Sequence, residues 1–515
     1  MTAADISLGS WFAARAARSA SRPALTFEGK TWTYGQLLER VDRLAAGFQE
    51  HGVRHGDRVG YLGNNHPAVL ETMLAASRLG AIFAPLNFRL TGPELSFIAR
   101  DAGLHTLVAD SAHQAVIDGV RDQLPVRSYV GVEGAGADWQ AFEWITDRSG
   151  RLAWPDPVAA DEVAVLMYTS GTTGRPKGVM LTHANLWWNN TNLMHLYDVL
   201  ADDVTLVSSP LFHIAGLNVT IPTTWRKGGE VVLHRAFDPQ ATLDDISRYR
   251  ISTLFGAPTM FEMVSRLPAF ESADLSSVRV IICGGAPVPE ALIRRFHERG
   301  IAMLNGYGLT ETAPSAAFLT AEYALTKLGS IGKAPLLSEI KIMDRDGAAV
   351  TEPGMPGEIC ARGPNVMKGY WNQPGETARA IDGEGWFHTG DIGYLDADGF
   401  LYIIDRIKDM VVSGGENVSS VEIEKVLLEH PSVVEVAIIG LPDERWGEAV
   451  TAVTVLIPGQ SVTLAELREF AGRSLSRYKL PTKLHVVSTL PRNPAGKILK
   501  FQLREDFRAT PPDPS

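Results

Sequence analysis

The sequence predicts an α/β protein built on parallel sheets, because strand-like and helix-like segments alternate along most of the chain. The clearest cases are apolar segments that are each followed by an amphipathic segment: 58–64 then 67–81, 105–110 then 112–124, and 279–285 then 289–300. With 515 residues, the chain is too long for a single hydrophobic core. We therefore expect more than one domain.

The pattern changes in the last third of the chain. Residues 339–363 contain short apolar segments interrupted by Gly, Pro and Asp, which is typical of a β-rich subdomain. From about residue 406 the sequence has elements of its own: helix 420–430, strands 434–440 and 451–457, and helix 463–475. We predict a large domain, 1–405, with two doubly wound α/β subdomains and the β-rich subdomain, and a small α+β domain, 406–515.

Charge and cysteine content exclude several classes of protein. The formal net charge is −11, so nucleic acid is not an expected partner. Cys283 and Cys360 are the only cysteines and lie in apolar segments, which is typical of reduced core residues in a cytoplasmic protein. The first residues do not form a secretory signal, and no uncharged apolar segment reaches the roughly 18 residues of a membrane span. We expect a cytoplasmic protein without a transmembrane segment.

The stretch YTSGTTGRPKGV, at 168–179, follows an apolar, strand-like segment at 163–167. Glycines let several backbone N–H groups point toward one anion, hydroxyl groups add donors, and a lysine adds a flexible cation. The residues concerned are Thr169, Ser170, Gly171, Thr172, Thr173, Gly174 and Lys177. The lysine does not open a helix as in GxxxxGK[ST], so we predict a phosphate-binding loop of another kind. The alternative is an ordinary turn.

Five further motifs accompany this loop: ICGGAPV at 282–288, NGYGLTET at 305–312, GWFHTGD at 385–391, DRIKDMVVSGGENV at 405–418 and PRNPAGKILK at 491–500. In this order the set resembles the AMP-forming adenylating superfamily, which includes acyl- and aryl-CoA synthetases, luciferases and peptide-synthetase adenylation domains. The resemblance covers nearly the whole chain and is strongest to bacterial fatty-acyl-CoA synthetases. It implies ATP, Mg²⁺ and coenzyme A as the small molecules of the reaction.

The resemblance implies a nucleotide site in which the loop holds the β- and γ-phosphates, while Glu311 and Thr169 place Mg²⁺. Glu311 read without the family is an acid at a helix start. The resemblance also implies the residues that contact the adenine and the ribose: Gly284, Gly285, Ala286, Tyr307, Gly308, Thr310, Asp391 and Arg406. Glycines allow close approach to a flat ring, and a carboxylate can accept hydrogen bonds from both ribose hydroxyls.

The same resemblance implies a mobile small domain. Lys497 matches the lysine that the family brings to the α-phosphate and the substrate carboxylate, and Lys408 matches the hinge about which the small domain turns. Gly414 and Gly415 would line the pantetheine tunnel. Trp446 would stack on the adenine of coenzyme A, or else it is a packed core tryptophan.

The segments SPLFHIAGLN, at 209–218, and FGAPTMFEMV, at 255–264, are predicted to form the acyl pocket. We expect His213, with an imidazole that titrates near the working pH, to gate the pocket or orient the thiol, although a structural histidine is an equal alternative. Ala215 and Gly216 are expected to leave space, and Thr259 and Met260 to line a roomy apolar site.

This pocket favours a medium- or long-chain fatty acid, activated as acyl-AMP and transferred to coenzyme A. The alternatives are an aryl acid such as a cinnamate, coumarate or ferulate, and a carrier-protein thiol as the acceptor. A luciferase-like oxygenase and a non-catalytic binding protein also stay open, and a homodimer is an open question. The chain departs from many relatives in having Ser419 and Ser420 after GGENV, and both serines are expected to cap a helix.

Overall fold

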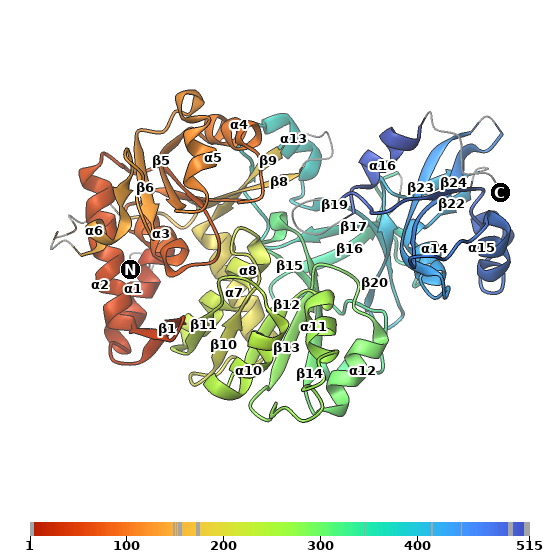
Figure 1. The fold of residues 1–515 in the computed structure, drawn as a ribbon, viewed down its shortest axis with the longest axis horizontal. Coiled ribbons are helices and arrows are strands. Elements are labelled where there is room, and N and C mark those ends of the chain that lie inside the picture. The colour runs from red at the N-terminus through yellow and green to blue at the C-terminus, as the bar shows by residue number, and fades with distance from the viewer. Residues whose placement is uncertain are drawn as a thin grey trace. The chain divides into compact units, whose positions relative to one another are not determined.

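The structure is a computed structural model (Figure 1) that describes residues 5–147, 150, 152, 157–170, 176–344, 346–413, 416–443, 445–492 and 498–508. The chain divides into two compact units. The larger unit comprises Met1–Ile340 and Cys360–His388, and the smaller unit comprises Lys341–Ile359 and Thr389–Ser515. The predicted boundary between residues 405 and 406 stays a prediction.

The first sheet of the larger unit is parallel at its centre and antiparallel at both edges. Its central strands are short, buried and rich in Val, Ile and Leu, which is the pattern expected of strands covered on both faces. In spatial order the strands are β15 (Ser315–Leu319), β14 (Ala302–Gly308), β13 (Val280–Gly284), β12 (Thr253–Gly256), β10 (Val204–Val207), β11 (Glu230–Leu233), β1 (Pro23–Phe27) and β2 (Lys30–Thr33).

The second sheet also has a parallel centre, but one edge is an antiparallel hairpin extended by a two-residue strand. In order, its strands are β18 (Gly369–Tyr370), β9 (Pro176–Thr182), β8 (Val163–Ser170), β4 (Ile82–Leu86), β3 (Arg58–Leu62), β5 (Leu104–Asp110), β6 (Ser128–Val132) and β7 (Gln140–Ala141). The hairpin edge matters for function because it contains the predicted phosphate-binding segment.

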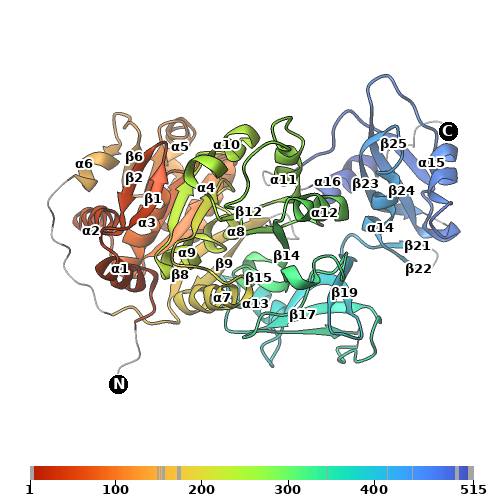
Figure 2. The ribbon, with the colours of Figure 1, turned by 90° about the horizontal axis from the view of Figure 1, so that it is seen from below.

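Helices cover these two sheets, and α1, α2 and α3 lie side by side in both views (Figures 1 and 2). Every residue of α3 is buried, so this helix belongs to the interior. The helices of the larger unit are α1 (Leu8–Arg18), α2 (Tyr34–Glu50), α3 (Pro67–Arg78), α4 (Gly92–Ala102), α5 (Gln114–Asp118), α6 (Phe142–Thr146), α7 (His183–Leu196), α8 (Ile214–Asn218), α9 (Ile221–Lys227), α10 (Pro239–Tyr249), α11 (Pro258–Ser265), α12 (Glu290–Glu298) and α13 (Pro374–Ala380). Short 3₁₀ turns are η1 (Arg121–Gln123), η2 (Thr310–Thr312) and η3 (Ala321–Tyr323).

A four-stranded sheet follows the change in sequence pattern, with the order β16 (Glu339–Met343), β17 (Gly357–Arg362), β19 (Phe387–Leu395) and β20 (Leu401–Arg406). The last sheet pairs β21 (Val411–Ser413), β22 (Glu416–Val418), β23 (Val433–Asp443), β24 (Gly447–Leu456) and β25 (Lys483–Val486). It is accompanied by α14 (Ser420–Leu427), α15 (Leu464–Ala471), η4 (Arg477–Lys479) and α16 (Lys500–Phe507). The predicted β-rich and α+β segments are thus present.

The predicted α/β fold class is confirmed, with two local corrections. The helix expected over 112–124 is only the five-residue α5, followed by η1. It ends before Gly119, because glycine disfavours the helical conformation. Ser419 caps α14 by accepting a hydrogen bond from the Glu422 N–H, but Ser420 lies inside the helix and is not a cap. Its Oγ donates instead to the buried carboxylate of Asp405, at 2.8 Å.

Both cysteines lie in the described part of the chain. Cys283 and Cys360 are both buried and unbridged, as expected for core thiols. Among the residues that the structure describes, no helix is both long enough and apolar enough to cross a membrane.

Candidate active site

The predicted phosphate-binding segment is a hairpin between β8 and β9. Strand β8 ends at Ser170 and β9 begins at Pro176, and Thr169 is the register partner of Lys177. Lys177 therefore stands on a strand beside the loop, which fixes its backbone more firmly than a loop position would. Gly171, Thr172, Thr173 and Gly174 lie outside the described residues.

Side chains of this hairpin have different surroundings. The hydroxyl of Tyr168 donates to Asp101 Oδ2 at 2.6 Å, so it takes no part in anion binding. The Lys177 ammonium lies 2.5 Å from Glu376 Oε2 and 5.0 Å from the centroid of the Tyr370 ring. Burial lowers the pKa of Lys177, and the negative charge of Glu311 opposes this shift.

Glu311 lies on the 3₁₀ turn η2, which several buried groups hold in place. The Asn365 side-chain amide donates to the carbonyls of Thr312 and Ser315, both at 2.7 Å. Asn218 Nδ2 donates to the Ala313 carbonyl at 2.6 Å, and the Glu311 carbonyl accepts the Met367 N–H at 2.8 Å. The turn is therefore a fixed platform for the Glu311 carboxylate.

The Tyr370 hydroxyl connects this turn with the hairpin. It donates to Glu311 Oε1 at 3.0 Å, while the Tyr370 backbone pairs with Val179 on β9. Burial and the Glu311 carboxylate raise the pKa of Tyr370, so the phenol keeps its proton and stays a donor. Lys177 and Glu311 thus both contact Tyr370: the ammonium lies over its ring, and the carboxylate accepts the hydrogen bond of its hydroxyl.

In the predicted adenine segment, the backbone requires glycine at positions 284 and 285. A Cβ at Gly284 would lie 2.6 Å from the Gly306 carbonyl oxygen of the neighbouring strand, so no larger residue fits. Gly285 has φ +85°, and both Gly285 and Ala286 are exposed after the end of β13. Gly308 and Tyr307 end the neighbouring strand β14, and Thr310 opens the turn to Glu311. These residues occupy adjacent strand ends, where α/β proteins hold ligands.

Asp391 and Arg406 are register partners on β19 and β20 of the smaller unit. Arg406 Nε lies 3.4 Å from Asp391 Oδ1, and the Asp391 side chain is only 7% exposed. Lys408 follows in a turn in which the Arg406 carbonyl accepts the N–H groups of Asp409 and Met410, both at 3.0 Å. The predicted ribose pair is thus together and the predicted hinge residue is adjacent to it in the chain.

Three predicted residues of the smaller unit, Lys497, Gly414 and Gly415, lie outside the described residues. Trp446 is described and is 43% exposed, with the Arg445 guanidinium 4.7 Å from its ring centroid. This exposure rules out the alternative of a packed core tryptophan. Its stacking on coenzyme A stays a prediction.

His213 precedes helix α8, and the structure corrects its expected titration. Its ring centroid lies 4.3 Å from that of Phe212, and its Nε2 has no hydrogen-bond partner among the described residues. Burial, with a smaller contribution from the Arg89 cation, lowers the pKa of His213 to about 4. The imidazole is therefore neutral at the pH where it was expected to titrate.

We predict that titration of His213 leaves no limb in the pH–rate profile between about pH 5.5 and 7.5, because the folded-state pKa lies below this window. The measurement is kcat against pH for the parent and for His213→Gln, which cannot titrate. Both profiles should have the same shape even if the variant is slower. A limb near the ordinary histidine pKa in the parent alone would contradict this.

The remaining acyl-pocket residues contain a second correction. Gly216 was expected to leave space, but a Cβ there would lie 2.4 Å from the Pro210 carbonyl oxygen. Glycine is required at position 216 because the backbone of Pro210 lies directly against this residue of α8. Ala215 packs against a buried cluster that includes Leu193 and Val219, and Met260 Sδ accepts the Ala257 N–H at 3.4 Å. Thr259 is exposed at the start of α11.

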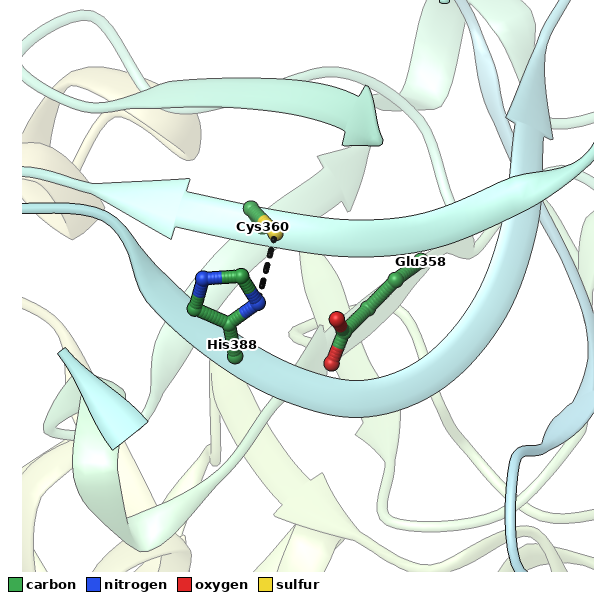
Figure 3. Close-up of side chains that lie close together, drawn as sticks. All are labelled: Glu358, Cys360 and His388. Atoms are coloured by element: carbon green, nitrogen blue, oxygen red, sulfur yellow. Dashed lines mark hydrogen bonds between the residues drawn. The ribbon is translucent and has the colours of Figure 1, made fainter. Parts of the chain in front are cut away.

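A group of potential metal ligands lies in the four-stranded sheet (Figure 3). Glu358 and Cys360 come from β17 and His388 from β19, with Cys360 Sγ 3.6 Å from His388 Nδ1. The Glu358 carboxylate accepts the Gly390 N–H at 3.0 Å, which is a structural use of one of its oxygens. We assign no catalytic role to this group.

Sequence reasoning missed Asn365, Tyr370 and Glu376, although all three contact predicted site residues or their turn. They lie far along the chain from Glu311 and Lys177, with 59 positions between Tyr370 and Glu311 and 199 between Glu376 and Lys177, in a segment that the sequence indicates to be a turn and a short helix. The pairing of β18 with β9 brings Tyr370 and the following helix with Glu376 to the site, and Asn365 reaches the Glu311 turn through its own hydrogen bonds.

Comparison with known proteins gives the family. The sequence pattern of the family described as AMP-binding enzyme matches residues 12–371, and that of the AMP-binding enzyme C-terminal domain matches residues 422–497. A feruloyl-CoA synthase of Amycolatopsis sp is 43% identical over 97% of this chain and 99% of its own length. An indoleacetate–CoA ligase of Aromatoleum aromaticum is 40% identical (97% and 98%), and a long-chain-fatty-acid–CoA ligase of Mycobacterium tuberculosis is 38% identical (93% and 94%).

Solved structures agree. The o-succinylbenzoate CoA synthetase from Bacillus subtilis, in complex with its acyl-adenylate intermediate, matches with a TM-score of 0.86 and 34% identity, covering 96% of this chain and 97% of that one. The same enzyme in complex with ATP and a magnesium ion matches with a TM-score of 0.84 and 33% identity, covering 96% and 98%. The predicted superfamily, fold class and enzyme class are confirmed, and the chain belongs to the AMP-binding enzyme family of AMP-forming acid–CoA ligases.

Proposed function

We propose that this protein joins a carboxylic acid to coenzyme A at the expense of ATP, through an enzyme-bound acyl-adenylate. The observation that carries this proposal is the group of Lys177, Tyr370 and Glu311, in which a cation on β9 and a carboxylate on η2 both contact the same tyrosine. Phosphoryl chemistry needs such preorganised charges because it depends mainly on positioning and electrostatic stabilisation.

In the first half-reaction, a carboxylate oxygen of the acid attacks the α-phosphorus of ATP, and the bond to the β-phosphate oxygen breaks. Pyrophosphate leaves with the electron pair. Lys177 neutralises charge on the departing phosphates, and Lys497 is proposed to stabilise the α-phosphate and the acid oxygen. Gly284 and Gly285 receive the adenine, and Asp391 with Arg406 holds the ribose.

The residues fit a magnesium ion. The Glu311 carboxylate and the Thr169 hydroxyl are hard oxygen donors of the kind that Mg²⁺ prefers, and η2 holds the carboxylate in place. When bound, Mg²⁺ would neutralise phosphate charge during pyrophosphate departure.

In the second half-reaction, the sulfur of coenzyme A attacks the carbonyl carbon of the acyl-adenylate, the thiol proton passes to solvent, and AMP leaves. Neutral His213 can accept or donate a hydrogen bond there but carries no charge at neutral pH. Exposed Trp446 offers an aromatic face for the coenzyme A nucleotide.

For the substrate, we propose an aryl acid of the ferulate type, and we keep a medium- or long-chain fatty acid as the second candidate. The similarity to a feruloyl-CoA synthase and an indoleacetate–CoA ligase supports the first, and that to a fatty-acid–CoA ligase supports the second. Gly216 meets the Pro210 carbonyl and Ala215 packs against a buried cluster, so neither residue leaves the space expected from the sequence.

The test is a panel of ferulate, coumarate, cinnamate, indoleacetate and saturated fatty acids of increasing length. Pyrophosphate release and thioester formation are measured separately for each acid. The proposal expects the highest kcat/KM with a hydroxycinnamate. A preference for long fatty acids would select the second candidate, and thioester formation without pyrophosphate release would contradict the adenylate mechanism.

Ala215→Trp tests the placement of the pocket. Because Ala215 is a predicted residue of the acyl pocket, an indole there should shift the preference toward smaller acids, such as benzoate or a short fatty acid. The measurement is the ratio of kcat/KM for a small and a large acid. Trp188→Ala, on the exposed part of α7, is the control and should leave the ratio unchanged. An unchanged ratio in folded Ala215→Trp would place the pocket elsewhere.

A further inference from the structure

The segment from β18 through α13 lies across the strand that contains Lys177. Tyr370 pairs with Val179, and the Trp371 N–H donates to the Gly178 carbonyl at 2.7 Å. Thr377 Oγ accepts the Tyr370 N–H at 2.9 Å, which ties α13 to β18. The helix therefore has a fixed place beside β9.

This arrangement puts a carboxylate on the lysine. Glu376, on α13, lies 2.5 Å from the Lys177 ammonium, and its other oxygen is held by Arg379 one helical turn later. Lys177 is only 12% exposed and Glu376 is 28% exposed, so their pairing is partly shielded from water. Lys177 also lies over the Tyr370 ring. The contact thus fixes both the position and the charge balance of the lysine.

A bound polyphosphate would compete with this contact. Lys177 cannot place its ammonium against phosphate oxygens and keep the Glu376 carboxylate at its present distance without bringing two anions together. The carboxylate must therefore give up the lysine, or part of its contact with it, when the nucleotide binds.

We propose that Glu376 is a positioning residue that holds Lys177 until ATP phosphates replace its carboxylate, and so sets the affinity for the nucleotide. This rests on the proposed role of Lys177 in binding ATP. Arg379 weakens the hold of Glu376 on Lys177, because its guanidinium partly neutralises the Glu376 carboxylate. Glu376 acts through Lys177 and touches no reacting atom, so it changes binding of ATP more than the rate of the bound complex.

The sign of the effect follows from the competition. Glu376→Gln keeps the shape of the side chain but removes its charge, so MgATP should bind more tightly, by roughly two- to fivefold, as expected for a partly exposed ion pair. Arg379→Gln should weaken binding, because Glu376 then pairs more strongly with Lys177. In the double variant, the Arg379 change should have little further effect, because its target charge is gone.

The experiment is calorimetric titration of the full chain with Mg²⁺ and an ATP analogue whose α–β bridge cannot be cleaved, beside steady-state KM and kcat for ATP. Glu290→Gln is the matched control, because Glu290 also pairs with an arginine one helical turn later, on a helix of the same unit. It should leave affinity unchanged. Glu376→Asp, which keeps the charge on a shorter chain, should restore most of the parent affinity.

Tighter binding in Glu376→Gln, with kcat changed by less than the affinity, supports the proposal. Unchanged or weaker binding in folded Glu376→Gln overturns it, as does an Arg379→Gln effect that persists undiminished in the double variant. If the parent itself does not bind the analogue, the proposed function fails instead. If the parent binds the analogue and Lys177→Ala binds it equally well, Lys177 takes no part in nucleotide binding. That result overturns the role of Glu376 and leaves the proposed ligase reaction standing.

Discussion

Removing the positive charge of Lys177 or the negative charge of Glu311 is expected to slow pyrophosphate release by on the order of a hundredfold or more. The changes are Lys177→Ala and Glu311→Gln. Among the described residues of strands β8 and β9, Lys177 is the only cation, and Glu311 lies on a turn that the buried side-chain amides of Asn365 and Asn218 hold in place. A neighbouring side chain therefore cannot easily compensate for the loss of either charge. The measurement is pyrophosphate–ATP exchange in the presence of the acid.

Two controls separate charge at the site from charge in general. Lys227→Ala and Glu290→Gln remove a lysine and a glutamate that are exposed in the same unit, and both should exchange pyrophosphate like the parent. Raising the Mg²⁺ concentration should partly rescue a conservative Glu311→Asp but not Lys177→Ala. Parent-like exchange in Lys177→Ala or Glu311→Gln would remove these residues from the first half-reaction.

The second large effect is a separation of the two half-reactions. Lys497→Ala should fail with acid and ATP, yet it should convert supplied acyl-adenylate to thioester, because no phosphate charge then needs to be stabilised. Lys408→Pro should do the reverse. Fixing φ in the turn after Arg406 restricts the rotation proposed for the small domain and leaves the nucleotide contacts of the larger unit intact.

The assay is single-turnover thioester formation from synthetic acyl-adenylate and coenzyme A, beside pyrophosphate release from acid and ATP. Lys408→Ala is the control for the hinge, because it removes the same side chain and leaves φ free. Equal loss of both steps in folded Lys497→Ala and Lys408→Pro would leave domain rotation without support. Normal adenylation by Lys497→Ala would show that the resemblance at NPAGK was misleading.

Local patterns in the sequence were enough to predict most of the fold. Buried parallel strands such as β13 are continuous apolar runs that end in glycine, and α3 has proline at its first position. These signals depend on a few neighbouring residues, so they can be recognised without the tertiary structure. The shorter α5 shows the limit, because a glycine and β-branched residues inside an apolar pattern weakened the helix.

The parts of the site that could not be predicted depend on contacts between distant segments. Glu376 meets Lys177 across 199 positions because β18 adds to the hairpin edge. Asn365 holds the Glu311 turn through bonds that no spacing rule announces. Gly216 was interpreted as empty space, but its neighbour is a backbone carbonyl, and the His213 pKa depends on burial that a sequence does not give.

The proposed mechanism requires that the acid be activated as an adenylate before coenzyme A reacts. The most direct test is to mix the enzyme with ATP, Mg²⁺ and ferulate without coenzyme A, and to measure pyrophosphate and enzyme-bound nucleotide by rapid quench. We expect a burst of one pyrophosphate and one feruloyl-adenylate for each active site, and conversion of that adenylate to feruloyl-CoA and AMP when coenzyme A is added. If the panel selects another acid, that acid takes the place of ferulate. Formation of ADP and phosphate, or no pyrophosphate until coenzyme A is present, would exclude an adenylate formed before coenzyme A reacts.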